Sequence, residues 1–351
     1  MARVATLNER VARLQDSLDE PLLVTNPTNV FYLSGFRSSN AALFVEQDRV
    51  RLLTDFRYRE AAASVDGVEL VETPRSLLTG IAKNVEGRIA FEAATMTYAN
   101  WRTLTDAGLE LVPTTGVVEK LRAVKSEGEL TKIRAACAIT DAVYAAMAEE
   151  PFVGRTEREL AWKMELLFRE QGADALAFDL IVGSGPTGAR PHGRPSDLTV
   201  APNTTVVIDA GCFVEGYTSD CTRTFATGDL PDDLARAYDV CAQAQRDALA
   251  AVRSGARGSD VDAVSRTPIE AAGWGDRYGH GLGHGVGLLV HEAPTLRPES
   301  EDVLEPGNVV TVEPGIYLEG EGGVRIEDLV VVTEDGCEIL TGFTKELVTV
   351  S

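Results

Sequence analysis

Apolar residues in the first third of the chain occur in short runs that alternate with segments of helical spacing. Helical patterns cover residues 6–18, 58–64 and 98–106. The apolar runs are residues 22–25, 42–45, 50–54, 68–71, 88–91 and 109–112. Because short strand-like runs alternate with helices, we predict an α/β domain over residues 1–120, built on a mixed sheet whose faces are covered.

The pattern changes near residue 120, where longer helical segments begin. Ser126 with Glu129, and Thr156 with Glu159, have the spacing of capping boxes, which begin helices. The second of these helices is expected to stop at Gly172, and strand-like segments then run to about residue 225.

The same order of elements then repeats. Pro231 is expected to open a third helix, and Ser259 to cap a fourth that ends near Gly273. Strand-like segments fill residues 278–350. Two helices followed by strands, twice, predict an internally duplicated α+β domain over residues 126–351, although the two halves share almost no sequence identity.

Length, charge and cysteine content narrow the class of protein. A chain of 351 residues favours two domains, and a net charge of −21 disfavours nucleic acid and anionic membranes as partners. No apolar run approaches the roughly 20 residues of a membrane span, and the N-terminus lacks the apolar core of a secretory signal. The five cysteines include no Cys-x-x-Cys pair, so we expect a reducing compartment, the cytoplasm.

Two acids lie on either side of a predicted hairpin turn. Asp209 ends an apolar strand, and Asp220 follows a turn placed near Val214 and Glu215. Counting outward from this turn sets Asp209 opposite Asp220, where Cβ atoms lie about 4.5–5.5 Å apart. Two facing acids repel each other unless a cation lies between them.

A second hairpin repeats this arrangement. Glu313 ends an apolar strand, a glycine-rich turn follows, and Glu327 lies inside the next apolar strand. Folding about Gly320 sets Glu313 against Glu327. An unpaired carboxylate in that position would be costly to bury.

Three of the four histidines lie within one short segment, in which glycine alternates with larger residues. As an extended strand, one face carries His280, Leu282, His284 and Val286, and the other is bare backbone. We expect the bare face to let a metal site or a substrate come close. His291 has the opposite parity, so the chain must bend if all three histidines serve one site.

These residues together predict a hydrolytic metal centre. Two aspartates, two glutamates and at least one histidine match the charge of two divalent cations. Oxygen-rich ligation suits Mn²⁺ or Co²⁺ better than a thiolate zinc site. A pair of such cations activates water and polarises a carbonyl group.

At this point the chain resembles the pita-bread metallopeptidases, the superfamily of methionine aminopeptidase, aminopeptidase P and prolidase. The matching segments are residues 208–211, 217–224, 280–288 with His291 and Glu292, 312–317 and 323–328. Residues 29–40 and 53–61 resemble the N-terminal domain of creatinase and prolidase, which methionine aminopeptidases generally lack. The resemblance therefore favours the Xaa-Pro peptidase branch, with a creatinase-like α/β domain before a pita-bread catalytic domain.

The resemblance also implies roles for individual residues. The five metal ligands of the family fall on Asp209, Asp220, His284, Glu313 and Glu327. Glu313 is then also the proton shuttle for the bridging water, His192 assists the tetrahedral intermediate, and His291 contacts the scissile amide or its leaving nitrogen.

Further residues are expected near the substrate. By resemblance, His280 and Arg325 support the ligands or line the substrate pocket, and Phe178 is an aromatic near the active site, although a core role suits it equally. Thr187 stands where many relatives carry Asn, which changes the expected pocket wall.

The implied function is removal of the N-terminal residue from small peptides with proline in second place. The compact length favours an Xaa-Pro dipeptidase; the alternative is an aminopeptidase P that acts on longer peptides. A dipeptidase must recognise a free carboxylate, and Arg37, in a Gly/Ser-flanked loop, is a candidate, with a solvated loop arginine as the other interpretation. The resemblance also implies a homodimer and two divalent ions, Mn²⁺ first, with Co²⁺ or Zn²⁺ as alternatives.

Two other classes of protein share this fold. A creatinase-like hydrolase works without metals, and a non-catalytic binding module needs none. Both are expected to have lost metal ligands, whereas all five ligand positions are occupied here by suitable residues.

Overall fold

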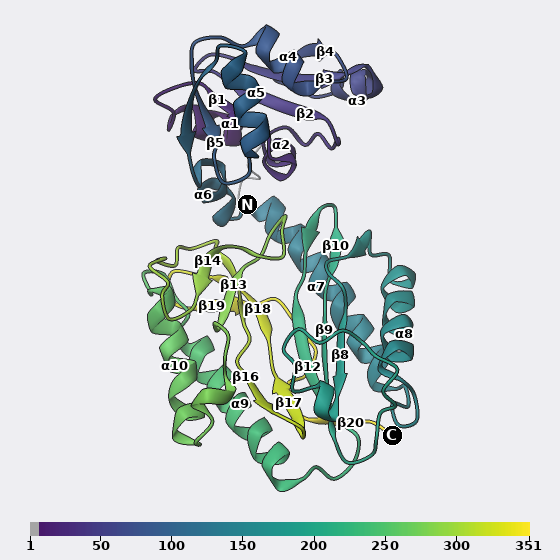
Figure 1. Ribbon diagram of the computed structural model, residues 1–351. Coiled ribbons are helices and arrows are strands. Elements are labelled where there is room, and N and C mark those ends of the chain that lie inside the picture. Colours follow the sequence, from purple (N-terminus) through teal and green to yellow (C-terminus); the bar gives the residue numbers. More distant parts are fainter. Residues whose placement is uncertain (1–6) are drawn as a thin grey trace. The chain divides into compact units, whose positions relative to one another are not determined.

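The computed structural model describes residues 7–351 (Figure 1). The chain divides after residue 122 into two compact units. Each unit has its own buried core. The first residue of the helix expected over 6–18 lies outside the described residues, and the helix itself, α1, spans Leu7–Gln15.

The first unit is an α/β domain with one mixed sheet. Its strands are β1 (Leu22–Val24), β2 (Ala41–Val45), β3 (Val50–Asp55), β4 (Glu69–Thr73), β5 (Arg88–Glu92) and β6 (Glu110–Thr114). Its other helices are α2 (Pro27–Ser34), α3 (Arg59–Ala62), α4 (Leu77–Asn84), α5 (Tyr98–Asp106) and α6 (Val117–Ala123), with a 3₁₀ turn at Phe56–Tyr58. The strand order is β4-β3-β2-β1-β5-β6, antiparallel at β1–β2 and β2–β3 and parallel elsewhere. All six predicted strands are present.

Three helices of this unit, α2, α4 and α6, were not predicted from apolar spacing. Helix α2 begins at Pro27 after the cap Asn26, and ends at Gly35, whose φ is 69°. Helix α4 begins after the cap Ser76. Helices α2 and α4 are only 8 residues long, so they hold too few turns for a clear periodicity, and their signals are the end residues.

The second unit contains the predicted repeat of two helices and a set of strands. The first half holds α7 (Glu127–Ala148), α8 (Glu157–Glu170), β7 (Ala175–Leu176), β8 (Ile181–Ser184), β9 (Thr205–Ala210), β10 (Cys212–Val214), β11 (Tyr217–Thr218) and β12 (Cys221–Ala226). The second half holds α9 (Asp232–Ala251), α10 (Gly258–Ala271), β13 (Gly283–Gly285), β14 (Glu292–Leu296), β15 (Val309–Val312), β16 (Gly315–Leu318), β17 (Gly322–Arg325), β18 (Asp328–Val332), β19 (Cys337–Ile339) and β20 (Val348–Thr349). Short 3₁₀ turns lie at Gly185–Thr187 and Gly275–Arg277.

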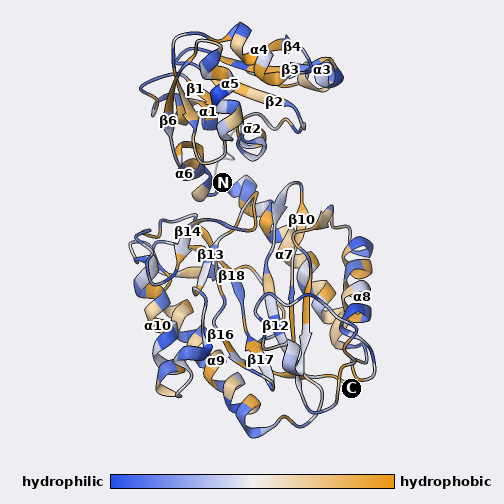
Figure 2. Ribbon diagram, viewed as in Figure 1, coloured by the Kyte–Doolittle hydropathy of each residue, from blue (hydrophilic) through white to orange (hydrophobic). Residues whose placement is uncertain are grey.

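In this unit the strands lie between two pairs of helices, α7 with α8 and α9 with α10 (Figure 1). One buried cluster joins α7 and α8 to β8, β9 and β12, and two others join α9 and α10 to the later strands. In Figure 2 helices such as α8 alternate between polar and apolar colours, as expected for helices that bury one face. The strands that hold or flank the four acids are thus packed against helices on both sides.

The helix starts of the second unit follow the predicted capping chemistry, with one exception. Glu129 accepts from the backbone N–H of Ser126 at 3.0 Å, and Glu159 accepts from that of Thr156 at 2.7 Å, so both capping boxes are confirmed. The cap predicted at Ser259 is wrong, because α10 begins at Gly258 after Arg257. A Cβ at Gly258 would lie 2.2 Å from the carbonyl oxygen of Thr295, so close packing against β14 sets this helix start.

None of the described helices is long and apolar enough to span a membrane.

Candidate metal centre

The first acidic hairpin differs in register from the prediction. Asp209 on β9 pairs with Thr222 on β12, two positions beyond Asp220. The reason is the turn, which is centred on Glu215 and Gly216 with φ values of 48° and 88°. Two consecutive residues with positive φ make a tight hairpin turn, and glycine favours the second of those positions. The turn predicted at Val214 and Glu215 was therefore one residue too early.

Asp220 nevertheless reaches the same place as Asp209. It lies between β11 and β12, where the chain passes from the small sheet of β7, β10 and β11 into the sheet that contains β9 and β12. Carboxylate oxygens of Asp209, Asp220 and Glu327 all lie within 4.8 Å of one another, and the three residues are buried.

The second hairpin has the predicted register. Val312 pairs with Asp328 on one side, and Gly315 pairs with Arg325 on the other. Glu313 and Glu327 therefore hold opposite positions between these two ladders. The turn residue Gly320 has a φ of 83°, as a fold centred there requires.

The glycine-rich strand brings His284 to these acids. His284 Nε2 lies 3.2 Å from Glu313 Oε1 and 3.8 Å from Asp220 Oδ2. The chain bends as predicted, since the His291 ring centre lies 4.2 Å from that of His284. The five residues thus form one cluster of four carboxylates and an imidazole.

The bare face of this strand packs against neighbouring backbones at Gly283 and Gly285, although Gly281 and Gly283 also line the cavity described below. A Cβ at Gly283 would lie 2.0 Å from the carbonyl oxygen of Thr311, and one at Gly285 would lie 2.3 Å from that of Ala293. The glycines let the backbones of β14 and β15 approach on both sides. They therefore help to fix the position of His284.

Burial and mutual repulsion make the cluster electrostatically strained without a cation. Burial and the charge of Glu327 raise the pKa of Asp220 well above its usual value, and burial and the charge of Glu313 do the same to Glu327. Burial also raises the pKa of Asp209, although Arg325 opposes this. For Glu313 burial acts in the same sense, but the hydrogen bond and charge of His284 outweigh it and hold the pKa at about 2.

Two atoms of the cluster point to a bound cation. Asp209 Oδ1 and Glu327 Oε1 are buried and have no hydrogen-bond partner within residues 7–351. An unpaired buried carboxylate oxygen is costly unless something positive contacts it. Oxygen donors with one imidazole suit a hard or borderline divalent cation, so the residues present fit a metal centre.

Four members of the cluster line a cavity of about 760 Å³ in the second unit: Asp209, Asp220, His284 and Glu313. His192, which is exposed, and the half-buried Phe178 and His280 line the same cavity, as do His291 and Arg325. Burial lowers the pKa of His280 and of His291, with the charge of His284 adding to the effect at His291. All residues predicted near the substrate except Arg37 and Thr187 therefore border one space.

Arg37 belongs to the first unit, whereas the cavity belongs to the second. It is exposed, and its guanidinium carbon lies 3.9 Å from the ring centre of Phe31.

Arg325 links several parts of the cavity wall. Its guanidinium donates to Asp209 Oδ2 at 2.8 Å, to the hydroxyl of Tyr317 at 3.0 Å and to the carbonyl oxygen of Pro191 at 3.1 Å. His280 Nε2 lies 2.9 Å from the same Tyr317 hydroxyl. Arg325 and His280 thus support a ligand and the loop before His192.

Sequence reasoning missed several residues that orient the ligands. Thr222 Oγ1 donates to Glu327 Oε2 at 2.8 Å, and Thr311 Oγ1 donates to Glu313 Oε1 at 2.9 Å. Tyr317 was missed as well. The sequence did contain a signal, because each of these hydroxyl residues lies within an apolar strand. A buried hydroxyl group needs a hydrogen-bond partner, and a nearby carboxylate can be that partner.

The loop that carries His192 is held by a buried acid, Glu157, which sequence reasoning did not single out. Glu157 accepts from the backbone N–H of Ser184 at 2.8 Å and from that of Ser196 at 3.0 Å. The hydroxyl of Thr187 donates to Glu157 and accepts from the backbone N–H of Ser184 at 3.0 Å. Thr187 thus helps Glu157 to hold this loop in place.

Comparison with known proteins agrees with this geometry. Residues 131–334 match the sequence profile of metallopeptidase family M24, and residues 3–124 match that of the creatinase/prolidase N-terminal domain. The chain is 35% identical to an Xaa-Pro dipeptidase from Pyrococcus furiosus, over 97% of this chain and 100% of that protein.

Solved structures are similar over nearly the whole chain. The structure of an Xaa-Pro dipeptidase from Bacillus anthracis has a TM-score of 0.94 at 36% identity, and covers 98% of this chain and 100% of that one. The structure of an X-Pro aminopeptidase from Thermotoga maritima has a TM-score of 0.89 at 33% identity, and covers 96% and 100%. With more than half of its length matching the family profile, this chain belongs to metallopeptidase family M24.

Proposed function

We propose that this protein is an Xaa-Pro dipeptidase whose catalytic centre is a pair of divalent metal ions. The observation that carries the proposal is the buried cluster of Asp209, Asp220 and Glu327, joined by His284 and Glu313, at a cavity that also holds His192 and His291. Relatives that match at full length are named Xaa-Pro dipeptidase.

Family membership implies divalent cations, and we propose Mn²⁺, with Co²⁺ or Zn²⁺ as alternatives. The ligands would be Asp209, Asp220, His284, Glu313 and Glu327. A bound metal pair supplies an activated water and polarises the substrate carbonyl. The donor set, four carboxylates and one imidazole with no thiolate, supports a hard or borderline ion.

The side chains around the cluster have complementary tasks. Glu313 accepts the proton of the attacking water and passes it toward the leaving proline nitrogen. The hydrogen bond and charge of His284 lower the pKa of Glu313, which keeps this carboxylate in the ionised form that binds a cation. His192 and His291 line the cavity beside the ligands, where a donated hydrogen bond stabilises the oxyanion and the leaving nitrogen.

The proline in second place has a physical rationale. The X–Pro bond is a tertiary amide without an N–H group, so a peptidase that relies on that donor handles it poorly. A site in which histidines and cations contact the carbonyl oxygen and the nitrogen needs no such donor.

A dipeptidase must also bind the free carboxylate of its substrate, and the cavity contains an arginine suited to this task. Arg297 lines the cavity and is exposed, and its guanidinium makes no hydrogen bond or ion pair with the described residues. Arg194 lines it too, but lies 3.4 Å from the Asp179 carboxylate. We therefore propose Arg297, in addition to Arg37, as a candidate for binding the substrate carboxylate.

The alternative function is an aminopeptidase P that releases the first residue from longer X-Pro peptides. One observation supports this alternative function, because a solved structure at 33% identity is named an X-Pro aminopeptidase. The two functions differ in whether the second residue must carry a free carboxylate.

The test compares an X-Pro dipeptide with an X-Pro-Y tripeptide and with an X-Pro amide, after reconstitution with Mn²⁺. A dipeptidase cleaves the dipeptide with the highest kcat/KM, and Arg297→Met raises KM for the dipeptide but not for the amide. Faster cleavage of the tripeptide favours aminopeptidase P. Absence of bound metal by elemental analysis, together with full activity of Glu313→Gln, would exclude both functions.

We also propose a cytoplasmic homodimer that binds small peptides and neither nucleic acid nor membranes. The five cysteines, an odd number, are all unpaired, which suits a reducing compartment, and the net charge of −21 disfavours polyanions. Light scattering of the purified protein measures the assembly. The proposed domain boundaries, 1–120 and 126–351, are supported by the compact units at 1–122 and 123–351.

A further inference from the structure

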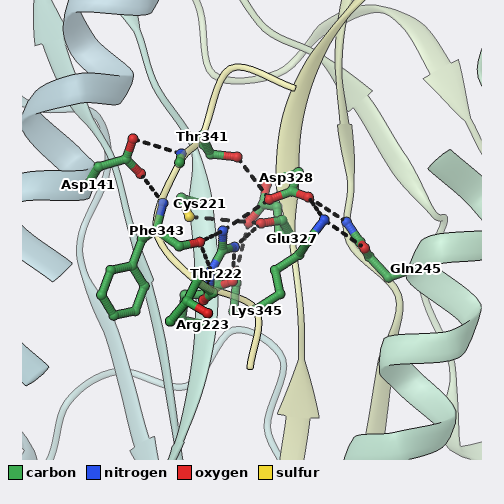
Figure 3. A network of polar contacts seen from close by, with 12 residues as sticks. Asp141, Cys221, Thr222, Arg223, Gln245, Glu327, Asp328, Thr341, Phe343 and Lys345 are labelled. Carbon is green, nitrogen blue, oxygen red and sulfur yellow. Dashed lines mark hydrogen bonds and ion pairs between the residues drawn. The ribbon is translucent and has the colours of Figure 1, made fainter. Parts of the chain in front are cut away.

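Behind the metal centre lies a polar network that no catalytic role explains (Figure 3). At its middle, Arg223 on β12 forms an ion pair with Asp328 on β18 at 3.0 Å, and their side chains are only 3% and 1% exposed. A buried ion pair is weak evidence for stability, because apolar residues of similar volume often stabilise a fold equally well. The pair therefore calls for another physical reason.

Arg223 is attached to a proposed ligand through that ligand's main chain. Its guanidinium donates to the carbonyl oxygen of Glu327 and, at 3.0 Å, to that of Thr222. The N–H of Glu327 in turn donates to the carbonyl oxygen of Thr222 at 3.1 Å. The backbone of Glu327 is thus held on both sides by β12.

The side chain of Glu327 is oriented by the same strand. Thr222 Oγ1 donates to Oε2 at 2.8 Å, whereas Oε1 is buried without a partner among the described residues. With its backbone and one oxygen fixed, Glu327 has a single free acceptor aimed at the cluster. That arrangement is what a metal ligand requires.

The network extends to a late segment of the chain, residues 341–345. Arg223 donates to the carbonyl oxygens of Phe343, at 2.6 Å, and Thr344, at 3.0 Å. Asp328 accepts from Thr341 Oγ1 at 2.9 Å and from the ammonium of Lys345. In Figure 3 this segment lies beside Arg223 and Asp328 and contacts both.

Asp141 on α7 holds the segment from its other side. It accepts from the backbone N–H groups of Gly342, at 2.7 Å, and Phe343, at 2.9 Å (Figure 3). Among the described residues, Asp141 makes no hydrogen bond or ion pair with Arg223 or Glu327, and it is only half-buried. It therefore offers a way to loosen the segment without touching the cluster.

We propose that Arg223 is a positioning residue that fixes Glu327 for metal binding, and that segment 341–345, clasped by Arg223, Asp328 and Asp141, is a structural part of the metal centre. The inference rests on the proposed metal pair. An ammonium cannot donate to all these carbonyl groups and to Asp328 at once, so lysine is a poor substitute for the planar guanidinium.

The test measures metal affinity of the full-length protein by chelator competition with Co²⁺, together with the Co²⁺ absorption spectrum and circular dichroism. We expect Arg223→Met to weaken binding of one ion about 10- to 100-fold and to change the spectrum, the usual size of effect for groups that orient ligands. Arg223→Lys should recover part of the affinity. With saturating metal, kcat should rise again while KM stays unchanged.

Two further variants separate positioning from folding. Asp141→Ala should weaken metal binding several-fold with the fold intact, so the proposal stays testable even if Arg223→Met does not fold. Arg134→Met is the matched control, because Arg134 pairs with Glu338 at 3.0 Å and contacts no ligand, and it should bind metal like the parent.

The measurements distinguish a failure of the proposed function from a failure of the role proposed for Arg223. If the parent protein binds no metal, the proposed function fails. If the parent binds two ions, and folded Arg223→Met and Asp141→Ala bind them equally tightly with an unchanged spectrum, the role of Arg223 and of segment 341–345 is overturned.

Discussion

The hydroxyl of Tyr317 lies between His280 Nε2, at 2.9 Å, and Arg325 Nη1, at 3.0 Å. Because Arg325 also donates to Asp209, this one phenol connects the glycine-rich strand, the second hairpin and a proposed ligand from the first. Burial raises the pKa of Tyr317 to about 12, so the phenol remains protonated across the physiological range.

Replacing Tyr317 by Phe should therefore impair catalysis without unfolding the protein. A hydrogen bond to a charged group contributes about 1.5 kcal/mol or more, so we expect kcat/KM for an X-Pro dipeptide to fall roughly 10-fold. Tyr278→Phe is the control, since its ring packs against His280 while its hydroxyl contacts only Ser265, at 3.2 Å, among the described residues. Equal activity of Tyr317→Phe and the parent would contradict this role.

Replacing Gly283 by alanine should displace the neighbouring proposed ligand, His284. A Cβ there would lie 2.0 Å from the backbone of Thr311, which cannot move without shifting β15. We expect a loss of about 1–3 kcal/mol of stability and at least about 10-fold weaker metal binding. Gly279→Ala, in the same segment but with nothing within 4 Å of the added Cβ, should behave like the parent in calorimetry and metal titration.

Removal of metal should destabilise the second unit. Ligand binding at 100 times its Kd stabilises a fold by about 2.7 kcal/mol, and for a unit of this size that corresponds to roughly 5–10 °C in Tm. Scanning calorimetry before and after chelation measures the shift. An identical transition in both states would argue against cations between the four carboxylates.

In the first unit, Asp55 should make stability depend on pH. Arg57 donates to both of its oxygens, at 2.8 and 2.7 Å, and holds the pKa of Asp55 well below its usual value. A carboxyl whose pKa is depressed by folding stabilises the fold above its unfolded pKa, about 3.9, and that stabilisation is lost as pH falls through the folded value.

Asp55→Asn should accordingly be less stable than the parent at pH 6, and the difference should shrink below about pH 4. Trp101 lies in this unit, so a background with Trp162 and Trp274 replaced by Phe lets its fluorescence report denaturant unfolding. A stability difference that stays constant from pH 6 to pH 3 would contradict the linkage.

The elements and the residues of the site were largely readable from local pattern. Capping boxes fixed the starts of α7 and α8, and the apolar strands that end in Asp209 and Glu313 were found by composition alone. What local pattern did not determine was backbone conformation at single residues. Glu215 adopts a φ of 48°, which a non-glycine residue rarely does, and that shift changed the partner of Asp209.

Long-range contacts were also beyond local pattern. The glycines at 283 and 285 meet neighbouring backbones that are distant in sequence, so whether their bare face is open or packed depends on tertiary structure. Arg223 and Asp328 are 105 residues apart, and neither spacing nor composition indicates that they meet.

The tie between Glu327 and residues 341–345 has a consequence for biosynthesis. During translation the four other proposed ligands emerge earlier, but the network that holds Glu327 is incomplete until Lys345 has been added and packed. A nascent chain or a fragment that ends before residue 341 would carry every proposed ligand and still lack a fully ordered centre. The order of the proposed metal centre would therefore depend on a segment that contains none of its ligands.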